Sequence, residues 1–516
     1  MHIISYAPLG YRGELVSVEV DIRTGIPGTD LVGLPASEVR EARDRIRVAV
    51  KNSRFVYPAC RILVNLAPAD VPKAGNGFDL AMALAILIAS GQMEATTPEP
   101  VMVLGELHLD GAVGPVRGVI SAVDEAAQAG IRRFVVPAEN RAEAEAVGVG
   151  RVVPVRHLSH TRVLTRELNS AAERQTAPAP WGSGHSTFAA VDYRSDGDFL
   201  SLRGSAIFKR ALTIAAAGGH HLIVVGPPGT GKSMGVGLLP SILPPLTRGE
   251  ALEVTRIHSV AGELDLARGL AVRRPFRAPH HNSSTEGLLG GGRTVRPGEV
   301  SLAHRGVLFL DEALEFHRPV LQGLREPLER KRVQISRAGR RYWFPAAFQL
   351  IMAANPCPCG NLGRAGRVCL CSMSEVDRYW RRVGGPLLDR VDLRVVSRSR
   401  DVGNLPVTEG SGDMRRSVDR AVVRQRSRRP KNGCNRNADL PVEALLDTSG
   451  LSAAAARAYR VACEKLRLST RASVSVVRVA RTIADLEDSD RVLEDHLLEA
   501  VAHRRNGEDR PLWDVG

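Results

Sequence analysis

The segment that most constrains this chain is Gly226–Ser233, which reads Gly-Pro-Pro-Gly-Thr-Gly-Lys-Ser. It matches the pattern G-x-x-x-x-G-K-[ST] at every fixed position, and the short apolar run Leu222–Val225 leads directly into it. Glycines let backbone N–H groups close around a phosphate, and a following helix points its positive end at that phosphate. The segment predicts a nucleotide-binding loop, against the weaker alternative of a glycine-rich turn without a ligand. The expected nucleotide-binding residues are Gly226, Pro227, Pro228, Gly229, Thr230, Gly231, Lys232 and Ser233.

A second segment, Gly306–Glu312, ends an apolar run in two acids. Ligands bind at the carboxyl end of a parallel sheet, which is where these acids would emerge. We expect ATP and Mg²⁺ as ligands. Lys232 would reach the β- and γ-phosphates, Ser233 would ligate Mg²⁺, Asp311 would hold Mg²⁺ through water, and Glu312 would polarise the attacking water.

Three further side chains are candidates for the same chemistry. Asn355 follows the apolar strand Gln349–Ala354 and can orient the attacking water. Arg390 lies between Asp389 and Asp392; it either pairs with one of them or, in a ring of subunits, reaches a neighbour's γ-phosphate. Arg478, on the polar edge of an expected helix, is either a surface charge or a second phosphate sensor.

Two C-x-C pairs follow Asn355 closely. Four thiolates at this spacing can bind one Zn²⁺ tetrahedrally and fix a loop, although C-x-C is less usual than C-x₂-C. The alternative is four reduced thiols in a glycine-rich loop. The four candidate ligands are Cys357, Cys359, Cys369 and Cys371.

The amino-acid composition indicates which partners the chain can bind and in which compartment it is expected. Lys and Arg exceed Asp and Glu by 14, which suits a polyanion partner such as DNA. No N-terminal segment has the pattern of a secretory signal, and the most apolar stretch, Leu80–Ser90, is too short to span a bilayer. We therefore expect a cytoplasmic protein without membrane contact.

Composition also divides the 516 residues into units. Strand-like and helix-like patterns alternate over residues 1–168, a Pro/Ala/Gly/Ser-rich linker covers 169–190, and a second α/β unit covers 191–400. Residues 401–439 include the Arg/Lys-rich run Arg415–Asn437, which we interpret as a solvated, mobile connector rather than a phosphate-contacting element. The remainder, 440–516, is expected to be helical.

Together these motifs resemble those of an AAA+ ATPase. The runs Phe276–Gly292, Ser301–Glu312 and Asn355–Gly360 resemble the magnesium-chelatase-like branch and, within it, the YifB/ComM group, bacterial proteins linked to natural transformation. The resemblance covers nearly the whole chain. It implies a parallel-sheet P-loop core, a helical C-terminal lid and a homo-hexameric ring. It also implies that Arg390 is the trans-acting finger, Asn355 sensor one and Arg478 sensor two, with Arg471 and Arg481 as close rivals for the last role.

The N-terminal unit resembles the Lon protease domain in three segments, Ile62–Leu84, Leu104–Gly118 and Phe134–Asn140. Active Lon proteases use a Ser nucleophile and a Lys base. Lys73 stands in the nucleophile's place, and no lysine follows Gly118 where the base should lie. We therefore expect an inactive, Lon-like domain that serves ring assembly or substrate guidance.

A basic hairpin is the expected DNA contact. Val333–Asn355 reads as two strands joined by a turn, and in related AAA+ helicases the equivalent hairpin points into the central pore. The Gly-rich loop Gly287–Gly292, with Arg293 and Arg296, is a second candidate pore element. An ordinary solvated loop is the alternative for both. The arginines expected to grip a phosphate backbone are Arg337, Arg340 and Arg341.

The function expected from these features is an ATP-driven DNA translocase or helicase. It would promote branch migration on single-stranded or branched DNA during homologous recombination of incoming DNA, with recombination proteins as further partners. A chelatase-type ATPase that remodels a partner during metal insertion is the alternative. An ATP-dependent protease is disfavoured by the missing Ser/Lys pair, and a nucleotide-dependent scaffold remains a third alternative.

Overall fold

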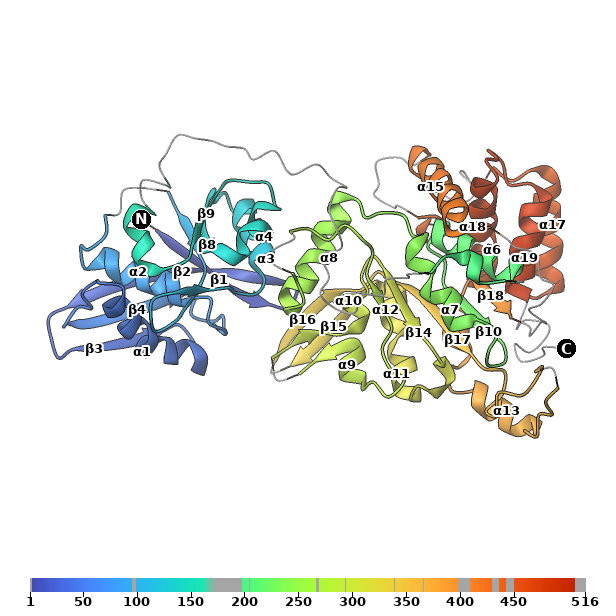
Figure 1. Cartoon of the computed structure of the whole chain (residues 1–516), viewed down its shortest axis with the longest axis horizontal. Helices are drawn as coiled ribbons and strands as arrows, with labels where there is room; N and C mark the ends of the chain where they lie inside the picture. Colours follow the sequence, from blue (N-terminus) through green and yellow to red (C-terminus); the bar gives the residue numbers. More distant parts are fainter. Residues whose placement is uncertain are drawn as a thin grey trace.

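The computed structural model contains an N-terminal α/β unit, a central α/β unit and a C-terminal helical unit (Figure 1). The expected linker at 169–190 lies outside the residues that the structure describes. Among the described residues, no helix has both the length and the apolar character needed to cross a membrane. The described residues are 2–94, 99–164, 168, 197–203, 205–265, 269–292, 294–337, 339–364, 366–397, 409–428, 436–441 and 450–505.

The N-terminal unit is built on a seven-stranded mixed sheet in the order β3-β4-β2-β1-β5-β8-β9. Its first two strands form an antiparallel hairpin, and β1 continues the sheet by pairing parallel with β5. The strands are β1 (Ile3–Leu9), β2 (Arg12–Arg23), β3 (Gly28–Val32), β4 (Arg61–Ala67), β5 (Val101–Val103), β8 (Arg133–Pro137) and β9 (Arg151–Val155), with the small pair β6 (Glu106–Leu107) and β7 (Val113–Gly114).

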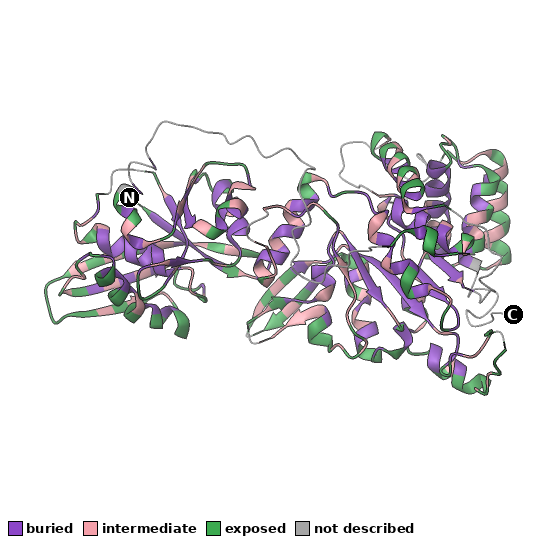
Figure 2. Ribbon diagram, viewed as in Figure 1, coloured by how far each residue is buried: buried purple, intermediate pink, exposed green. Residues whose placement is uncertain are grey.

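Helices cover this sheet because of their apolar patterns. In α1 (Ser37–Asn52) the buried side chains include Val39, Ala42 and Ile46, which recur every three to four residues and form one apolar stripe. Helix α2 (Asp79–Ala89) is apolar on all sides and accordingly lies in the core. The other α-helices among the described residues of this unit are α3 (Val119–Gln128) and α4 (Arg141–Glu145). Figure 2 shows this burial as a purple interior along the sheet.

The central unit has a five-stranded parallel sheet in the order β11-β14-β17-β10-β18. Most of its strand residues are buried on both faces, as expected for a parallel sheet covered by helices. The strands are β10 (Leu222–Val225), β11 (Phe276–Arg277), β14 (Val307–Leu310), β17 (Gln349–Ala354) and β18 (Leu393–Val396). The helices are α6 (Ala206–Gly218), α7 (Lys232–Gly237), α8 (Arg248–Ala261), α9 (Thr285–Leu289), α10 (Glu299–Leu302), α11 (Arg318–Gly323), α12 (Arg325–Arg330), α13 (Met373–Trp380) and α14 (Gly385–Leu388).

Two small hairpins project from this core. One pairs β12 (Gly290–Gly291) with β13 (Arg296–Pro297), and the other pairs β15 (Arg332–Arg337) with β16 (Arg340–Pro345). The second is the hairpin expected from the sequence. Its returning strand is shorter than expected, because β16 ends at Pro345 and β17 begins at Gln349 in a different sheet.

The C-terminal unit is helical, as expected, but it begins earlier than the sequence suggested. Helix α15 (Ser411–Ser427) lies inside the expected connector 401–439 and packs against α6 and α18 through Met414, Val418 and Ala421. The prediction of a mobile connector is therefore wrong for α15, because an apolar stripe runs through the basic segment. Residues 401–408 and 429–435 lie outside the description. Further α-helices in the part of this unit that the structure describes are α17 (Ala453–Lys465), α18 (Thr470–Leu486) and α19 (Glu494–Arg505).

Helix α8 of the central unit lies beside α3 and α4 of the N-terminal unit (Figure 1). The Ser259 hydroxyl accepts a hydrogen bond from the Gly118 amide at 2.8 Å and donates one to the buried Glu143 carboxylate. Arg256 forms an ion pair with Asp124 in the same interface. Buried polar groups are costly to leave unpaired, so this network stabilises one relative position of the two units.

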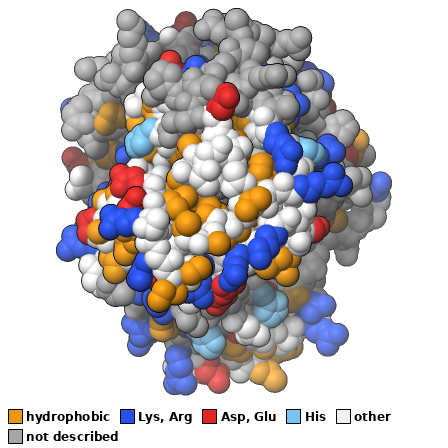
Figure 3. Space-filling view, turned by 90° about the vertical axis from the view of Figure 1, so that its left-hand side faces the viewer, with side chains coloured by type: hydrophobic (Ala, Val, Ile, Leu, Met, Phe, Trp, Pro, Cys, Tyr) orange, Lys and Arg blue, Asp and Glu red, His pale blue; other side chains and the backbone are white. Residues whose placement is uncertain are grey.

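The outer end of the N-terminal unit is partly apolar. Figure 3 shows hydrophobic side chains gathered there between Lys and Arg side chains. This unit contains several of the strongly exposed apolar side chains of the described structure, among them Ile26, Leu34 and Val56. The N-terminal unit therefore contacts the central unit on one side and exposes apolar surface to solvent elsewhere.

Candidate nucleotide-binding site

The Gly226–Ser233 segment joins β10 to α7 at the carboxyl edge of the central sheet. Gly229 and Gly231 have positive φ angles of 83° and 77°, a backbone conformation that favours glycine. Gly226 is required for another reason: a Cβ there would lie 2.2 Å from the Ser397 carbonyl oxygen at the end of β18. The loop surface is open, since a Cβ on Gly229 would meet no atom within 4 Å and Ser233 is exposed. This geometry fits a bound triphosphate.

Lys232 lies folded back over this loop. Its ammonium donates hydrogen bonds to the Gly226 and Pro227 carbonyl oxygens at 2.6 and 2.9 Å, and to Asn355 Oδ1 at 3.3 Å. Burial lowers the pKa of Lys232 to about 8, against the opposing pull of Asp311 and Glu312. A phosphate placed on the loop would bring a full negative charge next to this buried ammonium.

Asp311 and Glu312 follow β14 at the same edge. The Asp311 carboxylate accepts a hydrogen bond from the Glu312 amide at 3.0 Å, and Glu312 itself has a left-handed backbone with φ of 49°. A non-glycine residue in this conformation is uncommon and turns the two side chains out of the strand direction. Both carboxylates act electrostatically on Lys232, so the structure brings the two predicted motifs together.

Asn355 lies between these motifs because β17 lies between β10 and β14 in the sheet. Its side-chain oxygen contacts Lys232, and the carbonyl of the preceding Ala354 accepts a hydrogen bond from the Gly226 amide at 3.1 Å. An amide at this position can orient a water molecule between the phosphate-binding loop and the acids.

His281 was missed as a site residue in the sequence. It follows β11, the strand beside β14, and its Nδ1 lies 3.7 Å from Glu312 Oε2. Its ring lies 4.1 Å from that of His280. The adjacent histidines were visible in the sequence, but only strand order reveals that one of them faces Glu312.

The opposite, amino edge of the sheet carries a cavity of about 290 Å³. His221 precedes β10, Phe348 precedes β17 and Asp392 precedes β18, so the cavity adjoins the starts of three parallel strands. Its other charged lining residues are Arg305, Glu329, Lys331, Arg390, Arg436, Asp439, Arg471 and Arg478. The sheet thus has a phosphate-binding loop at one edge and an arginine-rich cavity at the other.

Arg390 lies in this cavity and not at the phosphate-binding loop of its own chain. Its guanidinium donates hydrogen bonds to Glu329 Oε2 at 2.7 Å and to the Pro386 carbonyl oxygen at 2.6 Å. The predicted alternative partners, Asp389 and Asp392, are not the ones it uses: Asp389 pairs with Arg504, and the Asp392 carboxylate accepts a hydrogen bond from Ser475.

Arg478 lines the same cavity, where it donates to the Leu440 carbonyl oxygen at 3.0 Å. The two alternative candidates for the sensor-two role, Arg471 and Arg481, lie in different surroundings. Arg471 lines the cavity too and shares the Glu329 carboxylate with Arg390, at 3.3 Å. Arg481 is buried and pairs with Asp485 at 2.9 Å, so it stabilises the interior of the C-terminal helical unit. The structure therefore places Arg478 and Arg471 beside Arg390.

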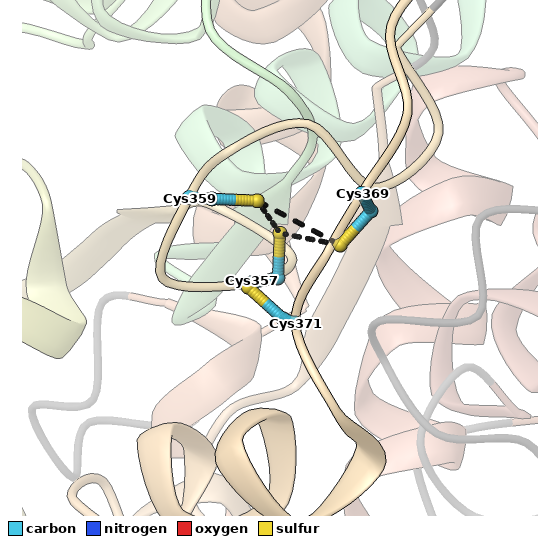
Figure 4. A group of neighbouring side chains, drawn as sticks. All are labelled: Cys357, Cys359, Cys369 and Cys371. Carbon is cyan, nitrogen blue, oxygen red and sulfur yellow. Dashed lines mark hydrogen bonds between the residues drawn. The ribbon is translucent and has the colours of Figure 1, made fainter.

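The four cysteines predicted to bind metal come together in the loop after Asn355 (Figure 4). All four Sγ atoms lie within 4.8 Å of one another, and Cys357 is buried while Cys359 is exposed. The Cys357–Cys359, Cys359–Cys369 and Cys357–Cys369 sulfur distances are 3.4, 3.7 and 3.6 Å. The loop adjoins the phosphate-binding loop, because a Cβ on Gly360 would lie 3.0 Å from Pro228 Cγ.

The hairpin arginines divide between two partners. Arg337 donates to the Gly292 carbonyl oxygen, which links the hairpin to the second predicted pore element, whereas Arg340 donates to the Asp70 carbonyl oxygen of the N-terminal unit. Arg341 is exposed. Arg293 lies outside the described residues.

Lys73, which stands in the place of the protease nucleophile, is fully buried, and its ammonium donates to the Pro68 carbonyl oxygen. The start of α3, where a general-base lysine was sought, carries Val119 and Ile120 and is covered by Ser259 of α8.

Comparison with known families agrees with this geometry. The family model described as magnesium chelatase, subunit ChlI, matches residues 198–404. Models described as subunit ChlI of Mg-chelatase and as its C-terminal region match residues 18–140 and 408–504. The last match includes α15.

Similar proteins cover almost the full length. An uncharacterized protein of Mycobacterium tuberculosis is 40% identical over 98% of both chains. The competence protein ComM of Haemophilus influenzae is 39% identical over 97% of both chains, and the uncharacterized protein YifB of Escherichia coli is 39% identical over 96% of both. The Lon protease of Phenylobacterium zucineum is 28% identical over 27% of this chain and 18% of its own length.

Proposed function

Because the chain belongs to the YifB/ComM family of magnesium-chelatase-like AAA+ ATPases, we propose that it hydrolyses ATP between the subunits of a hexameric ring and thereby moves DNA. The work on DNA would be branch migration during recombination of incoming DNA. The relative named as a competence protein supports this pathway, and the formal net charge of +14 suits a polyanion.

One observation carries the proposal: the phosphate-binding loop and Arg390 lie at opposite edges of one sheet. The four residues of β10 separate His221 in the arginine-rich cavity from Gly226, and these five steps span roughly 16 Å at the usual rise per residue. Arg390 cannot cover this distance within its own chain. A head-to-tail ring would bring the cavity of one subunit to the loop of the next.

The residues at the loop fit ATP and Mg²⁺. Lys232 would bind the β- and γ-phosphates, while the Ser233 hydroxyl and, through water, Asp311 would hold the ion, which neutralises charge on the phosphates when bound. Glu312 would polarise the attacking water and Asn355 would orient it. Arg390, with Arg478 beside it, would stabilise transition-state charge in the neighbouring subunit's site.

Two alternatives are less well supported. A chelatase-type ATPase that remodels a metal-insertion partner shares the ATPase core, and would show ATP turnover that responds to a protein partner and not to DNA. Peptidase activity is not expected, since the buried Lys73 offers no hydroxyl nucleophile and α8 covers the start of α3.

We also propose that the cysteine cluster binds one Zn²⁺. A tetrahedral site with Zn–S bonds of about 2.3 Å has sulfurs about 3.8 Å apart, close to the separations in this loop, whereas a disulfide needs about 2.05 Å. The Leu362 amide donates to Cys357 Sγ at 3.4 Å, a contact typical of the groups that orient thiolate ligands. The ion would fix the loop segment that packs on Pro228.

The DNA function is tested by ATP turnover with no DNA and with single-stranded, duplex and branched DNA. We expect stimulation by DNA, strongest with the branched substrate, and branch migration that disappears in Glu312→Gln while ATP binding remains. Lack of response to every DNA, or branch migration that persists in Glu312→Gln and Lys232→Ala, would refute the coupling.

The zinc proposal is tested by elemental analysis of the purified protein, where we expect about one Zn²⁺ per chain. Cys357→Ser should remove the metal and lower the melting temperature, whereas Cys463→Ser, outside the cluster, should do neither. Metal-free wild-type protein with all thiols freely titratable would contradict the site.

A further inference from the structure

The β15–β16 hairpin has two chemically different faces. Directly opposed residues of an antiparallel pair share a face, and side chains alternate between faces along each strand. Val333 opposes Phe344 on the inner face, and both are buried. The other face consists of three opposed pairs, which we name the outer hairpin face: Arg332 with Pro345, Gln334 with Trp343, and Ser336 with Arg341.

The outer hairpin face is exposed, positively charged and partly aromatic. Five of its six residues are exposed and Pro345 is half-buried. None of the six carries a carboxylate. Trp343 retains 36% exposure, although a tryptophan is usually more buried than that in a folded chain. The Trp343 ring, between Arg332 and Arg341 on this face, is therefore partly open to solvent.

The N-terminal unit supports this ring. The Tyr11 ring lies 5.1 Å from that of Trp343, and the Tyr11 amide donates to the Trp343 carbonyl oxygen at 3.3 Å. The Arg12 guanidinium lies 5.9 Å from the centre of the Trp343 ring and adds a third positive charge beside the outer hairpin face. Two units of the chain therefore build one surface.

This surface is held in place from both ends of the hairpin. Near its base, Phe344 packs with Tyr11, Ile257 and Leu302 in one buried cluster. At its tip, Arg340 binds the Asp70 carbonyl oxygen. A ring whose position is fixed loses little conformational entropy when a planar group stacks on it.

We propose that the outer hairpin face and Arg12 form a binding site for single-stranded nucleic acid, in which Trp343 stacks on an unpaired base and Arg12, Arg332 and Arg341 contact phosphates. Stacking on aromatic side chains within a basic groove is how proteins bind single strands without reading sequence. The site rests on the proposed DNA function and specifies the form of DNA engaged. Arg340, predicted from the sequence as a DNA contact, is assigned instead to holding the hairpin against the N-terminal unit.

The test is equilibrium binding of a labelled oligothymidine and of a duplex of equal length, measured by fluorescence anisotropy at several salt concentrations. Trp343→Leu removes the aromatic face but keeps an apolar side chain, and should weaken oligothymidine binding about tenfold, while Trp343→Phe stays within about threefold of wild type. Duplex binding should be unchanged in both variants, because paired bases offer no free face.

Arginines at the two ends of β2 give a matched control. Arg12→Ala should lower the salt dependence for oligothymidine by about 0.7 in the log–log slope, the value for one lost phosphate contact. Arg23→Ala, exposed at the far end of the same strand, should leave it unchanged. Melting temperatures within the range of wild type would show that the hairpin remains anchored.

The outcomes separate this site from the proposed function. Oligothymidine binding by Trp343→Leu equal to wild type, or equal losses for single strand and duplex, would overturn the stacking site while leaving DNA binding intact. Wild-type protein that binds neither oligonucleotide would overturn the proposed DNA function itself.

Discussion

The carboxyl and amino edges of the central sheet differ in the charges they present. At the carboxyl edge one ammonium, Lys232, faces two carboxylates, Asp311 and Glu312, around an open glycine loop. At the amino edge, a cavity collects five arginines and a lysine around three carboxylates. The first edge fits a triphosphate with its cation, and the second fits the negative charge that develops on a phosphate being transferred.

In the proposed function, neither edge by itself is a complete ATPase site. The segment Gly226–Ser233 contains no arginine, and Arg390 lies in the cavity at the other edge. In the single chain Arg390 pairs with Glu329 and, under the proposed function, would have to leave this carboxylate in order to contact a neighbour's phosphate. Assembly into a ring would therefore control hydrolysis by completing the site.

The largest effect is expected for Arg390→Ala, which tests whether the amino edge serves the neighbouring subunit. If the amino edge acts only on the neighbour's transition state, the turnover number should fall about 10³-fold, because a trans-acting arginine is worth that much in phosphoryl transfer. ATP affinity should stay within about threefold of wild type. Steady-state turnover and equilibrium binding of a labelled ATP analogue measure the two quantities; an equal loss in both would place Arg390 in nucleotide binding instead.

Lys232→Ala, at the carboxyl edge, should mainly weaken the binding of ATP. Loss of a charge-assisted contact to the phosphates should weaken ATP binding about 100-fold. The same binding assay measures this loss, with Lys51→Ala, which removes an exposed lysine of α1 in the N-terminal unit, as the control. Unchanged affinity in Lys232→Ala would show that the loop is not the main phosphate contact.

A smaller effect is expected for Glu329→Gln, which removes the carboxylate that pairs with Arg390 and Arg471 within the chain. Turnover should rise about two- to fivefold, since an exposed ion pair is worth little and its release is only part of the cycle. Glu326→Gln on the same helix, which removes an exposed pair with Arg330, is the control. Lower turnover in Glu329→Gln would indicate that the carboxylate positions the arginines productively.

The carboxyl edge could be predicted from sequence and the amino edge largely could not. Gly226–Ser233 and Asp311–Glu312 each follow an apolar strand. Ligands bind at the carboxyl ends of parallel strands, so the sequence alone predicts that the two segments lie close together. The Arg390–Glu329 pair joins residues 61 positions apart, and no local pattern specifies it. His281 became visible only through the strand order.

The two basic segments, α15 and the β15–β16 hairpin, could also be predicted only in part from the sequence. The arginine-rich composition of the expected connector concealed α15, although Met414, Val418 and Ala421 already formed a helical stripe in the sequence. In the hairpin, the turn and the alternation of Val333 and Ile335 were readable. The partners of Arg340 and Trp343 in the N-terminal unit were not, because they depend on how two units pack.

The most direct test of a shared site mixes two inactive chains. Lys232→Ala chains retain Arg390, and Arg390→Ala chains retain the phosphate-binding loop, so some interfaces in a mixed ring are intact. After equal amounts are allowed to exchange subunits, turnover should recover to roughly a quarter of the wild-type rate if interfaces act independently. A mixture no more active than the average of its two components would contradict a site built from neighbouring subunits.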